Sequence, residues 1–274
     1  MDVLTAGGQI SGPYTYSYLA SNSCDVYLFG EEHTNQHQCT EGHDVVDVLR
    51  ALVKEGVDVY VEMPTHYKSK FDASELLCRK SSTSQPRTKL LNDLRTCMYI
   101  LQRQGYQNVH FVDPRQHFGP ITFSDEETAF IDEMKRHPDS HALTQRLIRP
   151  LQKAEEKICD TLQPELHIIW HDLVFDKLSR LNCAIRRRSL DTALDIFHKA
   201  TDSIMNVYTV NLLLERCQQA NPKSRSLHVI YAGSAHCQDI ETILTSMKFR
   251  CVQHYAGTTN KSCVQLQPRA LLPH

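Results

Sequence analysis

The chain has 274 residues, of which 41% are hydrophobic and 23% charged, and its formal net charge is -2. The near-neutral charge argues against a basic surface for nucleic acid, so we expect no nucleic-acid partner. The amino-terminal segment lacks a basic stretch followed by a continuous apolar one, and no apolar run approaches the ~20 residues that span a bilayer. The ten cysteines are scattered without a CxxC pair, and we interpret them as reduced and mostly structural. These features predict a cytoplasmic protein without a membrane partner.

Four short runs rich in β-branched and aromatic residues predict strands. Each run is almost continuously apolar and closes with Gly or Pro, which is typical of strands buried on both faces of a parallel sheet. Helical periodicity lies between the runs, around 44–54 and again over 90–101 before Gly105, which would end that helix. Strands that alternate with helices predict an α/β fold with a mostly parallel sheet flanked by helices. The four runs are residues 24–30, 57–64, 108–114 and 226–233.

The middle of the chain has a different pattern. Ser124 is followed three residues later by Glu127, a capping box that predicts the start of a helix. From there to about Cys217 the periodicity is helical, and no convincing strand interrupts it. We therefore expect a single α/β domain over residues 1–274, with an all-helical insertion over 124–222 that acts as a lid.

The unit strand–GxxH–helix–strand occurs twice. The first copy contains "VYLFGEEH", ending at His33, and the second contains "HVIYAGSAH", ending at His236. The second copy continues with a helix over "DIETILTSMK" and a strand over "FRCVQHY". The repeat therefore predicts that equivalent strands carry His33 and His236 at their carboxyl ends.

Polar side chains follow all four predicted strands. In a parallel sheet, ligands bind outside the carboxyl ends of the strands. Imidazoles and carboxylates that converge there form either a divalent-metal site or a general acid–base site. Each group could instead form its own separate hydrogen bonds or ion pair, as Glu62 could with Arg115. The repeated motif favours a functional cluster of His33, Glu62 and His236. The candidate residues are Glu31, Glu32, His33, Glu62, Asp113, Arg115 and His236.

A rival hypothesis uses three histidines of one segment. His33, His37 and His43 have the spacing of the zinc ligands in HExxHxxGxxH metalloproteases. Thr34 stands where that family has its catalytic glutamate, and Thr40 replaces its glycine. A strand also runs directly into His33, where that family has a helix. We therefore interpret His37 and His43 as residues at the rim or surface.

The paired GxxH motifs, the glutamate on the second strand and the Asp-Arg at the third resemble the Tiki/TraB and erythromycin-esterase/ChaN-like superfamily. The resemblance covers about 25–115 and 226–256. Some members have an Arg-Asp/Asn-x-x-Met helix, for which this chain offers Asp202 and Met205 but has Thr201 at the arginine position. The resemblance implies one of three chemistries: metal-dependent proteolysis, hydrolysis by water that a histidine activates, or haem or iron binding.

The first functional hypothesis is a hydrolase of ester or peptide bonds, with a small molecule or a peptide as substrate. In its metal version, His33, Glu62 and His236 hold a divalent ion (Mn, Co or Zn) that activates water, Glu31 or Glu32 moves the proton, and Arg115 stabilises the oxyanion. In its metal-free version, His33 is the general base and Glu62 orients its ring. The second hypothesis is a binding or structural protein that retains the fold without turnover.

Overall fold

The computed structural model describes residues 8–32, 37–38, 42–64, 86–114, 131–132, 134–136, 140–219, 225–256 and 261–266. The chain forms two compact units. The first comprises residues 1–63, 67–111 and 217–274, and the second comprises 64–66 and 112–216. No helix in the described part of the chain is both long and apolar enough to cross a membrane.

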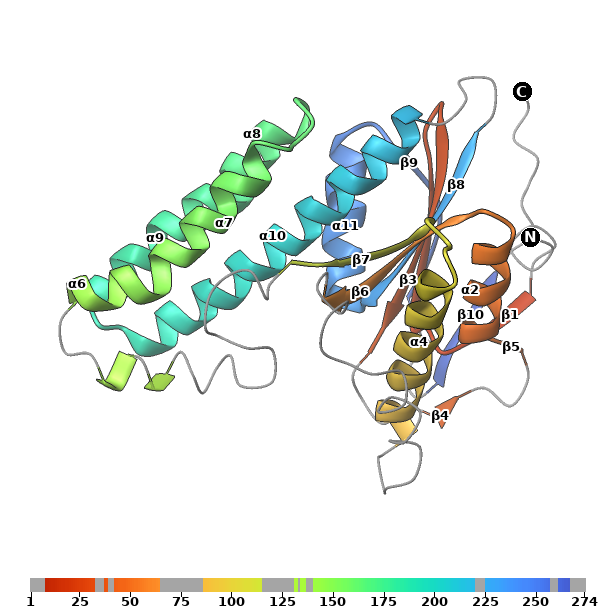
Figure 1. Ribbon diagram of the computed structural model, residues 1–274, viewed down its shortest axis with the longest axis horizontal. Helices are drawn as coiled ribbons and strands as arrows, with labels where there is room; N and C mark the ends of the chain where they lie inside the picture. The colour runs from red at the N-terminus through yellow and green to blue at the C-terminus, as the bar shows by residue number, and fades with distance from the viewer. Residues whose placement is uncertain are drawn as a thin grey trace. The chain divides into compact units, whose positions relative to one another are not determined.

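The first unit is organised around a six-stranded sheet (Figure 1). Its strands are β2 (Thr15–Ala20), β3 (Cys24–Glu31), β6 (Asp58–Pro64), β7 (Val109–Asp113), β8 (Ser226–Gly233) and β9 (Arg250–Ala256). They lie in the order β7-β6-β8-β3-β2-β9. The central strand β8 pairs in parallel with β3 and with β6, whereas β2 is antiparallel to both β3 and β9. The predicted α/β fold with a mostly parallel sheet is therefore confirmed.

Helices flank both faces of this sheet (Figure 1). Helices α2 (Val45–Lys54) and α4 (Pro86–Arg103) share a buried core with Tyr27 and Phe29 of β3. Helix α11 (Ser234–Ser246) contacts β3 and β8 and buries Ile240 among its apolar residues. Successive strand residues point to opposite faces of the sheet, so the two faces of each strand have different neighbours. This alternation determines which of the polar residues at the strand ends contact one another.

Several strands were not predicted from the sequence. Strand β2 is one of them, and the others form a second sheet with the order β4-β10-β1-β5. Two of its strands have only two residues, which is too short for a periodicity signal. The bounds are β1 Gly8–Ser11, β4 His37–Gln38, β5 His43–Asp44 and β10 Lys261–Leu266.

The second unit is helical. Every described residue between 131 and 216 that has regular secondary structure belongs to a helix, whereas Ser124 and its capping box lie outside the described residues. One helical run covers 140–159, a second covers 166–186, and both contain a short π-helical segment. Helix α10 (Leu190–Gln219) is continuous and extends past Arg216 into the first unit. The elements before α10 are α6 Ser140–Leu143, η3 Thr144–Ile148, α7 Arg149–Cys159, α8 Leu166–Trp170, η4 His171–Phe175 and α9 Asp176–Arg186.

A few polar contacts join the segments of the helical unit, whose helices bury apolar residues such as Trp170 and Phe197. Asn211 of α10 accepts the backbone N–H of Gln163 (2.8 Å) and donates to the carbonyl of Thr161 (3.3 Å). These bonds satisfy the backbone of the loop between the two helical runs. The Trp170 indole donates to Glu155 (2.7 Å), which joins those runs directly. The main part of this unit, residues 112–216, overlaps the expected insertion over 124–222.

Candidate functional site

Glu62 and His236 meet at the carboxyl edge of the main sheet. Glu62 lies near the end of β6, and His236 lies in the first turn of α11, which begins directly after β8. His236 Nε2 is 3.8 Å from Glu62 Oε1, and the side chains retain 12% and 18% of their exposure. The backbone N–H of Gly233 donates to Glu62 Oε2 (2.9 Å). The carboxylate therefore contacts both an imidazole and the amino end of a helix, which favours negative charge.

Glu31 ends the neighbouring strand β3 and has different partners. The Tyr231 hydroxyl donates to Glu31 Oε2 (3.2 Å), and the Ser234 hydroxyl donates to the Glu31 carbonyl (2.8 Å). Burial, followed by the nearby charge of Glu31, raises the pKa of Tyr231 well above its usual value. Strand alternation places Glu31 on the face of Phe29, which packs with α2 and α4, and Glu62 on the opposite face. The structure therefore groups Glu62 with His236 and groups Glu31 with Tyr231.

The glycines of the two GxxH motifs are not equivalent. A Cβ on Gly30 would collide with the Thr15 side chain and lie 2.9 Å from the Cα of Ser234. A Cβ on Gly233 would meet its nearest atoms, in Glu62 and His236, at 3.6 Å, an ordinary contact distance. Close packing thus requires glycine in the first motif and not in the second.

The other predicted site residues are only partly described. Asp113 ends β7 and is buried with 1% exposure. Glu32 directly follows β3 and is half-buried. His33 and Arg115 lie outside the described residues. Of the predicted metal ligands His33, Glu62 and His236, the structure therefore describes the last two.

The rival arrangement of three histidines requires a helix. His37 belongs to β4, which pairs with β10, and His43 belongs to β5, which pairs with β1. Both residues are in strands, so the HExxHxxGxxH geometry, which places its first two histidines one helical turn apart, does not form here.

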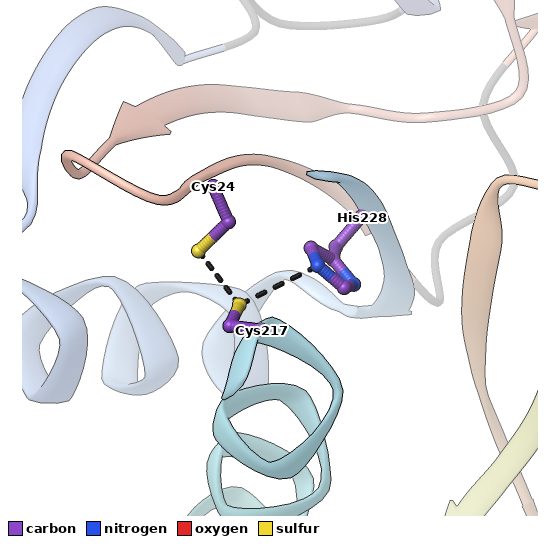
Figure 2. A group of neighbouring side chains, drawn as sticks. All are labelled: Cys24, Cys217 and His228. Atoms are coloured by element: carbon purple, nitrogen blue, oxygen red, sulfur yellow. Dashed lines mark hydrogen bonds between the residues drawn. The ribbon is translucent and has the colours of Figure 1, made fainter. Parts of the chain in front are cut away.

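A second cluster lies at the amino edge of the same sheet, where no site was predicted. Cys24 is the first residue of β3, His228 is the third residue of β8, and Cys217 lies near the end of α10 (Figure 2). All three are buried, and one ligand atom from each lies within 4.8 Å of the others. Within the described part of the chain, this cluster is the group of three or more His, Cys, Asp and Glu side chains that could hold a metal ion.

The two sulfurs of this cluster are in direct contact. The Cys217 thiol donates to Cys24 Sγ at 2.7 Å, and Cys217 Sγ lies 3.4 Å from His228 Nε2. The hydrogen bond from Cys217 lowers the pKa of Cys24 to about 7. The same bond, together with burial, raises the pKa of Cys217 above its usual value. Cys24 is therefore the more acidic of the two thiols.

Little in the sequence indicates this cluster. Its members are separated by 193 residues and by 11 residues, whereas recognisable zinc motifs place ligand pairs two to five residues apart. Scattered single cysteines predict structural residues, and Cys24 shares that pattern. A sequence signal existed in the polar His228, which interrupts an otherwise apolar buried strand.

The redox state of the cysteines also departs in part from the prediction. Cys263 is disulfide-bonded, and its partner lies outside the described residues. The expectation of reduced cysteines is therefore wrong for Cys263. The described free cysteines are Cys24, Cys97, Cys159, Cys183, Cys217, Cys237 and Cys251.

Comparisons with known proteins identify no relative: no protein-family model, no curated protein and no solved structure matches this chain.

Proposed function

We propose that this protein is a hydrolase of ester or peptide bonds whose site is centred on Glu62 and His236. The observation that carries the proposal is their contact at the carboxyl edge, 3.8 Å between Nε2 and Oε1. Two distant parts of the sequence deliver these residues to the end of adjacent parallel strands, where α/β proteins bind ligands. The resemblance of the paired GxxH motifs to the Tiki and erythromycin-esterase group supports the same reaction class.

The residues present fit a divalent ion. Glu62 and His236 offer a carboxylate oxygen and an imidazole nitrogen, and His33 follows the equivalent strand β3. Such a donor set suits Mn, Co or Zn, and a bound ion would supply Lewis-acid activation of water. The Gly233 N–H fixes one oxygen of Glu62 and so orients the other toward His236. Positioning of this kind is needed whether Glu62 binds metal or aligns an imidazole base.

Two single variants test the proposal. His236→Ala and His33→Ala should each lower hydrolysis of p-nitrophenyl esters or quenched-fluorescence peptides by at least about 10²-fold. In the metal version both variants should also weaken Mn²⁺ or Co²⁺ binding to a similar degree, because each removes one ligand. In the metal-free version His33→Ala should abolish turnover, while His236→Ala costs about 10²–10³-fold.

A second His–Glu pair provides a matched control. His254 Nδ1 lies 3.2 Å from Glu241 Oε2 at the edge strand β9, and the His254 side chain is 51% exposed. His254→Ala should leave hydrolysis unchanged. Activity in His236→Ala equal to that of the wild type would overturn the proposal, and so would hydrolysis that falls equally in His254→Ala. The absence of turnover with every ester and peptide would favour a binding protein that retains the fold.

A further inference from the structure

The buried Cys24–Cys217–His228 cluster has the composition of a metal site. It combines two thiols and one imidazole from β3, α10 and β8, all in the first unit (Figure 2). Cys24 and His228 have no solvent exposure, and Cys217 retains 9%. A strand interior at this position normally contains apolar side chains, so three ligand-type residues at one point require an explanation.

The surroundings of His228 support a metal ligand more specifically. Its Nδ1 lies 3.3 Å from the Tyr60 hydroxyl and 3.9 Å from Asp58 Oδ2. Asp58 is itself held by His110 Nε2 at 2.6 Å, and the His110 ring stacks on Tyr60 with centroids 4.6 Å apart. A histidine that binds metal usually has a carboxylate or another hydrogen-bonding group at its second nitrogen, which fixes the ring. Here that arrangement directs Nε2 toward Cys217.

We propose that Cys24, Cys217 and His228 bind a structural zinc ion. Two thiolates and an imidazole are the donor set that zinc prefers, and softer donors disfavour magnesium and calcium. The Ser226 hydroxyl lies 2.8 Å from His228 Nε2, and we assign it the fourth position, which closes the site with protein ligands. Binding releases the thiol protons, because zinc is ligated by thiolates.

The sulfur separation decides how far the side chains must move. Tetrahedral zinc with Zn–S bonds of about 2.3 Å places its sulfurs about 3.8 Å apart, whereas a disulfide requires about 2.05 Å. The observed 2.7 Å lies between these values, so the sulfurs must separate by about 1 Å to admit zinc. A disulfide would explain the two cysteines, but it would not explain why an imidazole nitrogen faces them, 3.4 Å from Cys217 Sγ.

The ion would stabilise the amino edge of the sheet. It would connect the last turns of α10 to the starts of β3 and β8, which already pair with each other through their backbones. The site is enclosed by protein, which is typical of structural zinc and not of catalytic zinc with an open position.

Metal content tests the proposal independently of the hydrolase. The protein should be expressed without a histidine tag, purified without chelator, and studied with Glu62→Gln and His236→Ala in place, which removes ligands of the carboxyl edge. Elemental analysis should find about one zinc per chain. Adding Cys24→Ser, Cys217→Ser or His228→Gln should reduce zinc to the level of the buffer. Cys183→Ser and Cys251→Ser, which replace exposed free cysteines, should retain it.

A measurement on the intact cluster covers variants that fail to fold. Titrating the thiols of the zinc-loaded protein with a mercurial should release zinc in proportion to the thiols blocked. The proposal is overturned if freshly reduced protein supplied with zinc retains none. It is also overturned if peptide mapping finds a Cys24–Cys217 disulfide in zinc-supplied protein, or if the serine variants retain as much zinc as the controls.

Discussion

The two edges of the main sheet differ in the chemistry of their polar groups. The carboxyl edge presents Glu62 and His236, half-buried and next to a helix amino terminus. The amino edge presents Cys24, Cys217 and His228, buried and backed by Asp58. Seven residue steps along β3 separate the edges by about 23 Å. A carboxylate and an imidazole with some solvent access suit turnover, whereas enclosed sulfur donors suit a permanent ion. Under the two proposals, the same strands would support one site for chemistry and one for stability.

Removing metal should have the largest effect on stability. A structural ion present at about 1,000 times its Kd adds about 4 kcal/mol to the free energy of unfolding, which corresponds to about 10 °C in Tm for a domain of this size. A strong chelator should therefore lower the Tm of the wild type by that amount and leave the Tm of Cys217→Ser unchanged. Thermal unfolding followed by circular dichroism measures both shifts. Equal Tm shifts in the two proteins would contradict the proposal that the stabilising ion is bound by the cysteines of the amino edge.

Replacing the glycines of the two GxxH motifs, Gly30 and Gly233, should have a smaller effect on the free energy of unfolding. Gly30→Ala forces a methyl group against Thr15 and the backbone of Ser234, and overpacking of this kind costs about 1–3 kcal/mol. Gly233→Ala places its methyl group at ordinary contact distance and should cost less than about 1 kcal/mol. Urea unfolding of the two variants compares them directly. A larger loss in Gly233→Ala would show that the motifs are packed differently from the structure.

The smallest effect concerns the buried Tyr231–Glu31 pair. Burial raises the pKa of Tyr231 above its ordinary value of about 10, so the unfolded chain loses this proton at a lower pH than the folded protein. The contribution of Tyr231 to stability is therefore complete below about pH 10 and is lost as the pH rises further. Between pH 9 and 11 the wild type should lose about 1.4 kcal/mol more than Tyr231→Phe.

The hydrogen bond from Tyr231 to Glu31 provides a control for this pH prediction. At pH 9 Tyr231→Phe should be less stable than the wild type by about 1 kcal/mol, because it loses that bond. Urea midpoints at the two pH values provide both numbers. Identical alkaline losses in wild type and variant would mean that Tyr231 titrates normally and that Glu31 is not enclosed with it.

The sequence predicted the part of the fold that depends on periodicity. The buried strands β3, β6, β7 and β8 were located to within about two residues, because each is a continuous apolar run closed by Gly or Pro. The same patterns predicted that Glu62 and His236 would lie at one edge of the sheet, since strand ends define that edge. Strand β2 was missed although it lies inside the sheet, because its hydroxyl-bearing residues give a weak apolar signal.

Other features depend on tertiary structure that no local pattern reports. The separation of Glu31 from Glu62 follows from the alternation of side chains on neighbouring strands, which requires the pairing register. The cysteine cluster requires the end of α10 to reach the start of β3, across 193 residues of sequence. Contacts this distant leave no spacing signature, so ligands of this kind become visible only when the strands are assembled.

The proposed difference between the two edges is tested most directly by identifying the atoms that coordinate the zinc ion. Zinc X-ray absorption spectroscopy should be recorded on the Glu62→Gln/His236→Ala protein, in which the carboxyl edge lacks its described ligands. Zinc bound by Cys24, Cys217 and His228 should have about two sulfur neighbours at about 2.3 Å and nitrogen or oxygen neighbours at about 2.0–2.1 Å. A shell of nitrogen and oxygen alone would contradict this prediction, because the ion would then be bound away from Cys24 and Cys217.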